Sequence, residues 1–303
     1  MFCRHNRLTA TCPICSQEGK SRAAKPASSG RPRSTGTPAS GGRPAKGAGG
    51  GSTRRSSTRL VTRKLTRAED DGYRNDLVPG MRAKADAERL AAALMLAVER
   101  LRPPGPHPAV AHEGDREEAL WLAFLLALVG PDAPERQAAV LAERPSWASG
   151  RDPDLPAEQT RTVHAYRAWA QRAGSQAAGF AGDAAWTPVR RFGRLFERLS
   201  LPGFGRARRF ELLVTLGAAG LYDLEPDALR FGADDDATTQ AAKRLLVSGD
   251  RMLLERRARE LAGATGVPLA ALDRGLALWG APATPLEAPG ELPSDLRRAL
   301  KLS

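Results

Sequence analysis

Apolar residues recur at helical spacing along most of the chain after about residue 58. The pattern predicts helices at 86–101, 114–130, 157–174, 186–200, 206–219, 237–247, 250–263 and 268–279. β-branched residues rarely alternate with polar ones, so the sequence carries almost no strand signal. We therefore predict an all-α fold.

Two of these segments carry more specific signals. Segment 114–130, GDREEALWLAFLLALVG, is apolar on most sides and should form a buried helix. Asp86 is expected to cap the helix at 86–101. Pro188 should occupy the first turn of the helix at 186–200, where its missing N–H costs nothing.

Composition divides the chain into four parts. Residues 1–16 form a compact Cys/His unit. Residues 17–57 are rich in Gly, Ser, Pro, Ala and basic residues and cannot bury apolar surface, so we expect a flexible, disordered basic linker. Residues 58–280 should form the helical domain. The C-terminal tail, 281–303, is Pro-rich and then a short polar helix.

Positive charge is concentrated at the N-terminus. The formal net charge is +12, and residues 1–70 alone hold 15 Lys or Arg against 3 Asp or Glu. The remaining residues are therefore electrically balanced. A basic arm on a neutral body indicates a polyanionic partner, nucleic acid first. The alternative is a basic tail that only aids solubility.

The sequence indicates a cytoplasmic protein. The longest apolar run, Ala119–Val129, is shorter than the roughly 20 residues needed to span a bilayer. The N-terminus, MFCRHNRLTA, lacks the apolar core of a signal peptide. All three cysteines lie close together near the N-terminus, so there is no disulfide framework typical of secretion. We expect a monomer without membrane contact.

The first residues hold a set of metal-ligand side chains. Cys3, His5, Cys12 and Cys15 have the spacing C-x-H-x6-C-x2-C, and a C-P-I-C knuckle can present two thiolates to one metal. Three sulfurs and one imidazole nitrogen suit tetrahedral Zn²⁺ and leave no open position. We predict a structural zinc site. The alternatives are a redox pair or unrelated residues.

The segment LPGFG, residues 201–205, separates two amphipathic helical patterns. Gly203 and Gly205 permit positive φ and allow another chain to approach the backbone. The exposed N–H groups would then lie at the start of the next helix, where an anion is favoured. Phe204 is expected to fill the core of this hairpin rather than stack on a base.

Arginines surround the same segment. Residues 187–209 contain seven arginines and one acid, Glu197, and Arg206, Arg208 and Arg209 directly follow the glycines. This pattern is typical of a helix-hairpin-helix that binds a DNA phosphate without reading sequence. The predicted DNA-binding residues are Gly203, Phe204, Gly205, Arg206, Arg208 and Arg209. The alternative is an ordinary tight turn between helices.

L-P-G-F-G followed by a helix resembles the hairpin of helix-hairpin-helix DNA glycosylases, which are two-lobed helical proteins. That family places a catalytic Asp at the cap of a later helix, in a context such as V-D-T-x-x-x-R-x-x-x-R. Here ADDDATTQAAKRLL, 233–246, stands in that place. Aligning Arg244 with the last Arg of the motif puts Asp235 at the catalytic position, and one insertion gives Asp236. The hairpin lysine of bifunctional members is absent, as is a late four-Cys iron–sulfur signature.

The chain is more similar still to one branch, the alpha-glutamyl/putrescinyl thymine pyrophosphorylases. The resemblance rests on CRHNRLTATCPIC, AWTPVRRFGRLFERLSLPGFGRARRFELLVTLGAAGLYDLEPDAL, AAKRLLVSGDRMLLERRARELA and VPLAALDRGLALWG. It implies an enzyme that excises a hypermodified pyrimidine from double-stranded DNA, such as phage DNA in antiviral defence. One alternative is a transferase that attaches an amino acid or polyamine to an activated hydroxymethyl pyrimidine. Another is a DNA-binding protein without catalysis.

Either reaction requires a base outside the stack, and hence base flipping into a pocket. Cleaving the bond between sugar and base develops positive charge on the sugar, which a nearby carboxylate stabilises. The Asp234–Asp236 run lies at a helix start, where the helix dipole keeps carboxylates ionised. Helix capping alone is the competing interpretation of this run.

Overall fold

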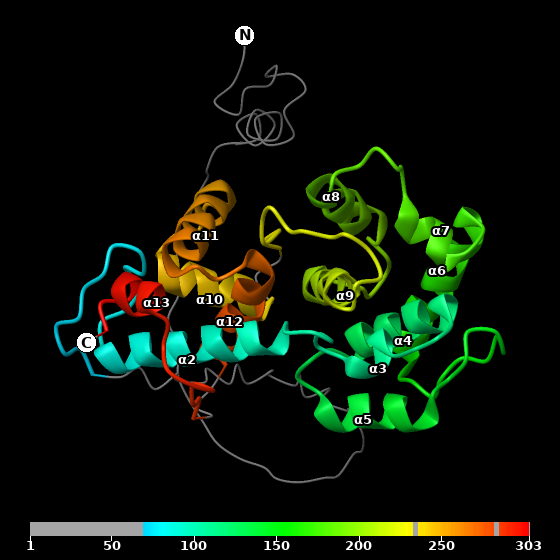
Figure 1. Ribbon diagram of the computed structural model, residues 1–303, viewed down its shortest axis with the longest axis horizontal. Coiled ribbons are helices and arrows are strands. Elements are labelled where there is room, and N and C mark those ends of the chain that lie inside the picture. Colours follow the sequence, from blue (N-terminus) through cyan, green and yellow to red (C-terminus); the bar gives the residue numbers. More distant parts are fainter. Residues whose placement is uncertain (1–68, 233–235, 282–284, 303) are drawn as a thin grey trace, which may run out of the picture. The chain divides into compact units, whose positions relative to one another are not determined.

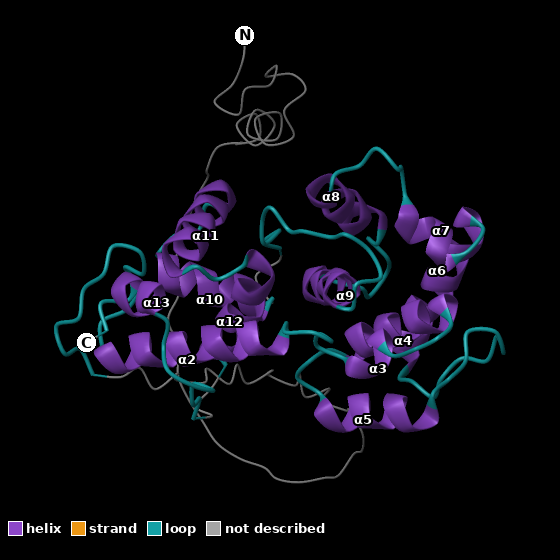
Figure 2. Cartoon of the chain, in the orientation of Figure 1, coloured by secondary structure: helices purple, strands orange, loops and turns teal. Residues whose placement is uncertain are grey.

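The computed structural model describes residues 69–232, 236–281 and 285–302, which lie in the second of the two units of the chain, Thr62–Ser303. Every regular element in these residues is an α-helix (Figures 1 and 2), which confirms the all-α prediction. The helices are α2 (Lys84–Arg100), α3 (Pro108–Ala111), α4 (Arg116–Val129), α5 (Pro134–Glu143), α6 (Ala157–Ala173), α7 (Gln176–Ala181), α8 (Pro188–Arg198), α9 (Arg206–Ala218), α10 (Ala237–Leu246), α11 (Arg251–Thr265), α12 (Leu269–Gly280) and α13 (Ser294–Ala299).

All eight helices given ranges from the sequence pattern are present, with ends shifted by a few residues, and α13 is the short helix expected near the C-terminus. Helices α3, α5 and α7 were not predicted. In α5 only Val140 is buried, so its sequence shows no apolar stripe. Helix α7 is too short for a periodic pattern, and Ser175 caps its start.

The start of α2 differs from the sequence prediction. The helix begins at Lys84, so Asp86 lies in its first turn and is not the N-cap. Ala83 occupies the cap position and offers no side-chain acceptor. The Lys84 N–H instead donates to Asp71 Oδ2 at 2.8 Å. A residue well upstream in the chain therefore supplies the contact that a local cap would make.

Helix α4 is the buried helix predicted from 114–130. Its start is capped by Asp115, whose side chain accepts hydrogen bonds from two backbone N–H groups, and it ends at Gly130. Residues 119–128 are all buried, because α3, α5, α7 and α9 pack around it. Among the described residues, no helix has the length and apolar character needed to cross a membrane.

The main packing contacts separate the helices into two groups (Figure 1). In the first group α12 packs against α2, α10 and α11, and α11 also contacts α13. In the second group α4 is central, α6 packs on α7, and α8 packs on α9. The segment before α10, yellow in Figure 1, runs between the two groups.

The described part of the C-terminal tail is integrated into the first group. Leu296, Leu300 and Leu302 are buried. The Tyr73 hydroxyl donates to the Leu300 carbonyl at 2.6 Å, and Asn75 Nδ2 donates to the Ala299 carbonyl at 2.8 Å. This segment therefore completes the fold of the first group.

Candidate nucleic-acid interface and carboxylate site

The turn between α8 and α9 is held by its own hydrogen bond and by a close contact with α6. The Phe204 N–H donates to the Leu201 carbonyl at 3.0 Å, and Gly203 has φ +74°, as the third residue of a type II turn requires. A Cβ at Gly203 would lie 2.5 Å from Thr162 Oγ1. That hydroxyl donates to the Pro202 carbonyl at 2.8 Å. The turn is therefore docked closely on α6, and only glycine suits residue 203.

The two residues that follow have different roles. Phe204 is 2% exposed and its ring lies 5.2 Å from that of Phe124, so it fills the core as predicted. Gly205 is the N-cap of α9 with extended backbone, φ −68°, so it does not use the positive φ expected from sequence. No heavy atom lies within 4 Å of where its Cβ would stand. The start of α9 is therefore open to an approaching group at Gly205.

Arg208 and Arg209 brace the hairpin itself. Arg208 Nη1 donates to the Gly203 carbonyl at 2.7 Å, and Arg209 Nη1 donates to the Phe196 carbonyl at 3.0 Å. The Arg209 guanidinium also lies 4.2 Å from the centre of the Phe196 ring. Both side chains are partly buried, and this burial lowers the pKa of each. They add positive charge at the turn while holding its shape.

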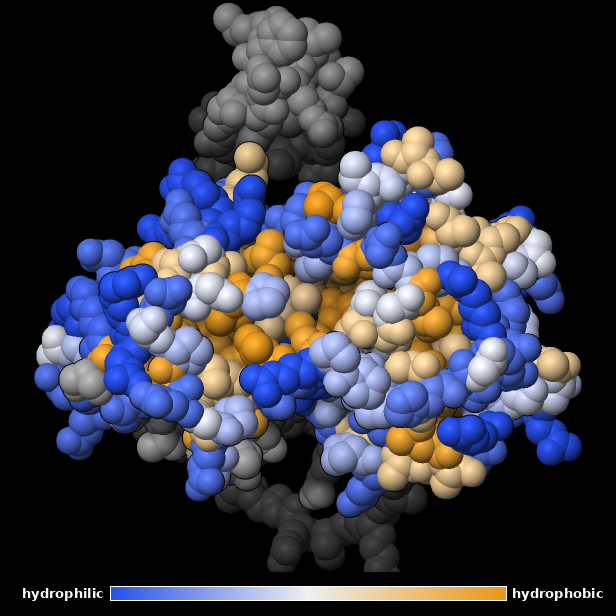
Figure 3. All heavy atoms as spheres, viewed as in Figure 1, coloured by the Kyte–Doolittle hydropathy of each residue, from blue (hydrophilic) through white to orange (hydrophobic). Residues whose placement is uncertain are grey.

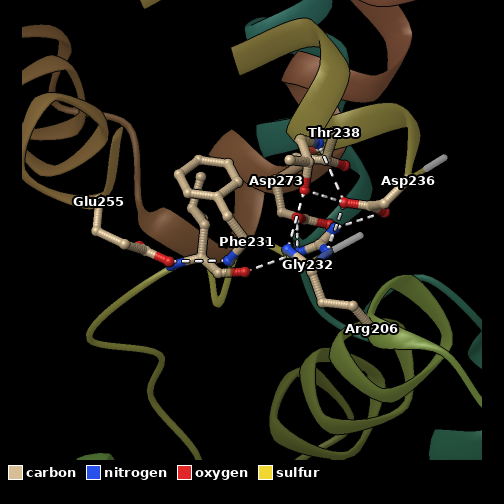
Figure 4. Close-up of polar contacts among 9 residues, drawn as sticks. Arg206, Phe231, Gly232, Asp236, Thr238, Glu255 and Asp273 are labelled. Atoms are coloured by element: carbon tan, nitrogen blue, oxygen red, sulfur yellow. Dashed lines mark hydrogen bonds and ion pairs between the residues drawn. The ribbon is translucent and has the colours of Figure 1, made fainter. Parts of the chain in front are cut away.

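Arg206 is placed differently from the sequence prediction. Its side chain is only 4% exposed, so it does not present a guanidinium to a phosphate at the surface. Its Nε lies 2.8 Å from Asp236 Oδ2, and its Nη1 lies 2.8 Å from Asp273 Oδ1 (Figure 4). The same Nη1 donates to the Leu229 carbonyl at 2.7 Å. Burial acts to lower the pKa of Arg206, but the two carboxylates outweigh it and raise the pKa.

Asp236 is the N-cap of α10. Its Oδ2 accepts from the Thr239 N–H at 3.1 Å and from the Thr239 hydroxyl at 2.6 Å, in addition to Arg206. Its Oδ1 faces Arg206 Nη2 at 3.3 Å, and the side chain is 9% exposed. Asp236 therefore caps α10, as the competing interpretation of the run predicts, and its carboxylate is bound by Arg206 and Thr239. Asp235, the other catalytic candidate, lies outside the described residues.

Asp273 is a member of this cluster that sequence reasoning did not identify. It lies in α12, within the segment LAALDRGLALWG, which is apolar apart from Asp273 and Arg274. Burial raises the pKa of Asp273, and the charge of Arg206 offsets this only in part. The lone acid in an apolar helix was the signal that could have marked it. One guanidinium thus faces two carboxylates in a largely buried cluster.

The segment before α10 is anchored to the same cluster. Glu255 of α11 accepts from the Leu229 N–H at 2.8 Å and from the Phe231 N–H at 2.9 Å. The Gly232 N–H donates to Thr239 Oγ1 at 3.1 Å. Arg206 also donates to the Leu229 carbonyl. The backbone of residues 229–232 is therefore bound by side chains from α9, α10 and α11.

A second buried ion cluster lies on α9. Glu211 contacts the Arg100 guanidinium, and His107 Nε2 lies 3.5 Å from Glu211 Oε1. Burial acts to raise the pKa of Glu211, but the contacts of His107 and Arg100 outweigh it and lower the pKa to about 2. This cluster joins α9 to the end of α2 and the start of α3.

Helix α8 carries a row of exposed arginines. Arg190, Arg194 and Arg198 are exposed and follow each other at intervals of four residues, so they form one stripe along the helix. In the part of the chain that the structure describes, the side chains of Arg190 and Arg194 make no hydrogen bond or ion pair. Arg198 lies over the Trp186 ring at 4.9 Å. Figure 3 shows hydrophilic atoms over α8 and α11, and hydrophobic atoms between them.

The predicted zinc ligands fall outside the described residues: Cys3, His5, Cys12 and Cys15. Among residues 69–232, 236–281 and 285–302, no group of three or more His, Cys, Asp or Glu is arranged to hold a metal ion. A zinc site therefore stays a prediction for the N-terminal unit.

Comparison with known proteins gives no relative for this chain. No protein-family model matches it, and no match was found among curated proteins or solved structures. Function is therefore inferred from the site itself.

Proposed function

We propose that the protein is a DNA glycosylase-type enzyme that flips out and excises a hypermodified pyrimidine base. The observation that carries this proposal is the Arg206–Asp236 ion pair. It joins the first residue of α9, beside the hairpin turn, to the cap of α10, where the Asp run ends. A grip on the DNA backbone and a carboxylate site would then be held in fixed relation, as base excision requires.

The proposed grip consists of the open start of α9 and the stripe on α8. The backbone at Gly205 is unobstructed at the N-terminus of a helix, where N–H groups and the helix dipole favour an anion. Arg190, Arg194 and Arg198 extend positive charge away from this point along α8. Contacts of this kind read phosphates rather than bases, so we expect binding without sequence preference.

The proposed chemistry is hydrolysis of the bond between the sugar and the base. As this bond breaks, its electron pair leaves with the base and positive charge develops on the sugar. Water then adds its oxygen to the sugar carbon, and its proton balances the charge of the departing base. We assign the carboxylate that faces the sugar to Asp235, and we assign Asp236 the task of holding the start of α10. Asp236, Asp273 and Arg206 together add net negative charge nearby when both acids are ionised.

The flipped base would enter between the two helix groups, in a two-lobed helix-hairpin-helix arrangement. The segment that leads into α10 runs there, and hydrophobic atoms gather between α11 and α9 on the face shown in Figure 3. An apolar surface suits a base removed from the stack. A bulky modified pyrimidine in phage DNA is the substrate class that we assign to this site.

The N-terminal unit would add affinity rather than chemistry. We propose that Cys3, His5, Cys12 and Cys15 hold a structural zinc ion and that the basic linker, 17–57, follows the DNA backbone. In this proposal the protein acts as a cytoplasmic monomer on double-stranded DNA.

One observation favours a second function, DNA binding without catalysis. The Asp236 carboxylate accepts hydrogen bonds from Thr239 and Arg206 through both oxygens. If the Asp run serves only to cap α10, the hairpin and α8 would still bind DNA. This candidate differs from the first in requiring no role for Asp235.

The test is to incubate the full-length protein with phage DNAs that carry different hypermodified pyrimidines and to measure abasic sites and released bases. The proposal predicts both products from at least one modified DNA and neither from unmodified DNA. Stable binding to these DNAs with no base released from any of them would support the second candidate. A base that becomes larger without being released would indicate transfer.

A further inference from the structure

Arg230 has a backbone conformation that is unusual for its residue type. Its φ is +57°, in the left-handed region that favours glycine. The amides on either side of it, those of Leu229 and Phe231, both donate to the Glu255 carboxylate. This two-point contact holds the backbone so that residue 230 is forced into the left-handed conformation. Such conformations persist where the surrounding structure imposes them, frequently at binding sites.

The side chain of Arg230 reaches α8. Its Nη2 lies 2.9 Å from where a Cβ at Gly193 would stand, so the guanidinium rests against bare helix backbone. Gly193 lies three residues after Arg190, a spacing that places the two on neighbouring positions of the helix surface, and Arg194 continues the exposed stripe one turn after Arg190. Arg230 therefore adds a guanidinium from another segment at the edge of the α8 stripe.

The protein contacts of Arg230 do not account for its placement. Asp227 Oδ1 accepts from its Nη2 at 2.7 Å, but the Asp227 side chain is 49% exposed, and such ion pairs contribute little to folding. Its Nε is buried without a hydrogen-bond partner. A structural role alone would be served better by glycine, which adopts the left-handed conformation without strain. The side chain is 29% exposed, so an anion can reach it.

We propose that Arg230 binds a backbone phosphate of DNA, together with Arg190 and Arg194 of α8. The ligand class is a phosphodiester, because a guanidinium offers a planar fork that matches two phosphate oxygens. Arg230 lies shortly before Asp236, in the segment anchored by Arg206 and Glu255. The inference rests on the proposed function and makes Arg230 the contact that positions the DNA strand next to the carboxylate site.

The test uses Arg230→Gly, a change that suits the left-handed backbone and so removes the guanidinium without damaging the fold. The matched control is Arg144→Gly, because Arg144 also has positive φ, 42°, and lies at the end of α5. Both variants lose one positive charge. Affinity of the full-length proteins for a fluorescein-labelled DNA duplex is measured by anisotropy at several salt concentrations.

We expect Arg230→Gly to bind several-fold more weakly than the wild type. The plot of log affinity against log salt should also become less steep, by about 0.9 in slope, the value for one phosphate contact. Arg144→Gly and Arg230→Lys should keep the wild-type slope. An unchanged slope for Arg230→Gly, or an equal loss in Arg144→Gly, would overturn the inference while leaving DNA binding by the wild type intact. Absence of salt-dependent DNA binding by the wild type would overturn the inference and the proposed function together.

Discussion

Arg206 Nε and Asp236 Oδ2 lie 2.8 Å apart, and this contact connects the starts of two helices that are well separated along the chain. Arg206 begins α9 at the hairpin, whereas Asp236 caps α10. Because Arg206 also pairs with Asp273 of α12, one guanidinium joins the second helix group to the first. The hairpin and the start of α10 are therefore joined by one buried ion cluster.

The Arg206 cluster should be needed for folding. Replacing Arg206 by Met leaves the carboxylates of Asp236 and Asp273 without their buried cation, which costs about 3–5 kcal/mol in comparable cases. The matched change Arg194→Met is on the surface and should alter the free energy of unfolding by less than about 0.5 kcal/mol. Urea unfolding followed by circular dichroism measures both. Equal stability of the two variants would show that Arg206 is not the link between the helix groups.

Glu211 should make stability depend on acid pH. Its pKa is lowered from 4.5 to about 2, so the folded protein binds this proton less readily than the unfolded chain. Its contribution is therefore present above pH 4.5 and is lost as the pH falls towards 2; for a shift of this size it is on the order of 3 kcal/mol.

Glu211→Gln should be less stable than wild type at pH 7, and the difference should shrink as the pH falls through this range. Glu197→Gln, an exposed change on α8, should parallel the wild type. The measurement is the free energy of unfolding in urea at pH values from 7 to 3. A difference between wild type and Glu211→Gln that stayed constant with pH would rule out this linkage.

Helix positions could be predicted because the apolar periodicity is strong where helices pack on a core. The stripe of Phe192, Leu195 and Phe196 marks α8, and the continuous apolar run marks α4. The same reasoning failed for α5, whose residues are mostly exposed and therefore lack a stripe. The prediction of Asp86 as the N-cap of α2 was wrong because Asp71 accepts the hydrogen bond from the Lys84 N–H instead. Asp71 is too far from the helix in sequence for a local capping pattern to reveal this contact.

The residues of the hairpin turn could be predicted from the sequence, but the ion pairs of Arg206 with Asp236 and Asp273 could not. The sequence alone identified Gly203 as a glycine that permits positive φ, and Phe204 as an apolar residue between two helical patterns. The structure shows the positive φ and the burial that these residue types predict. The burial of Arg206 depends on Asp236 and Asp273, both of which lie far along the chain from it. Nothing in the sequence near Arg206 distinguishes it from Arg208, which remains partly exposed.

The N-terminal unit should contain one zinc ion per chain. Three thiolates and one imidazole form a closed tetrahedral set, and so short a segment has too little apolar surface to fold without metal. Elemental analysis of freshly purified protein should give one zinc, and replacing Cys12 and Cys15 together by Ser should remove it. Protein without zinc, or unchanged zinc in the double variant, would exclude the site.

The basic linker should strengthen DNA binding through counterion release. Deleting residues 17–57 removes a set of Lys and Arg side chains, so affinity should fall and depend less steeply on salt concentration. The control is the full-length chain in which the serines of residues 17–57 are replaced by glycine, so that the charge of the segment is unchanged. Anisotropy titrations from low to high salt measure the slope, and an unchanged slope in the deletion would show that the linker does not touch DNA.

The most direct test of base excision compares Asp235→Asn with Asp236→Asn in single-turnover release of a hypermodified pyrimidine from DNA, alongside thermal unfolding. Asp235→Asn should release the base at least about 100-fold more slowly, because the positive charge developing on the sugar loses its partner, while its unfolding temperature stays at the wild-type value. Asp236→Asn should unfold at a lower temperature, because Arg206 loses one of its two buried carboxylates. Wild-type release rates in Asp235→Asn would contradict the assignment of the reacting carboxylate, and no release by the wild-type protein from any modified DNA would contradict base excision itself.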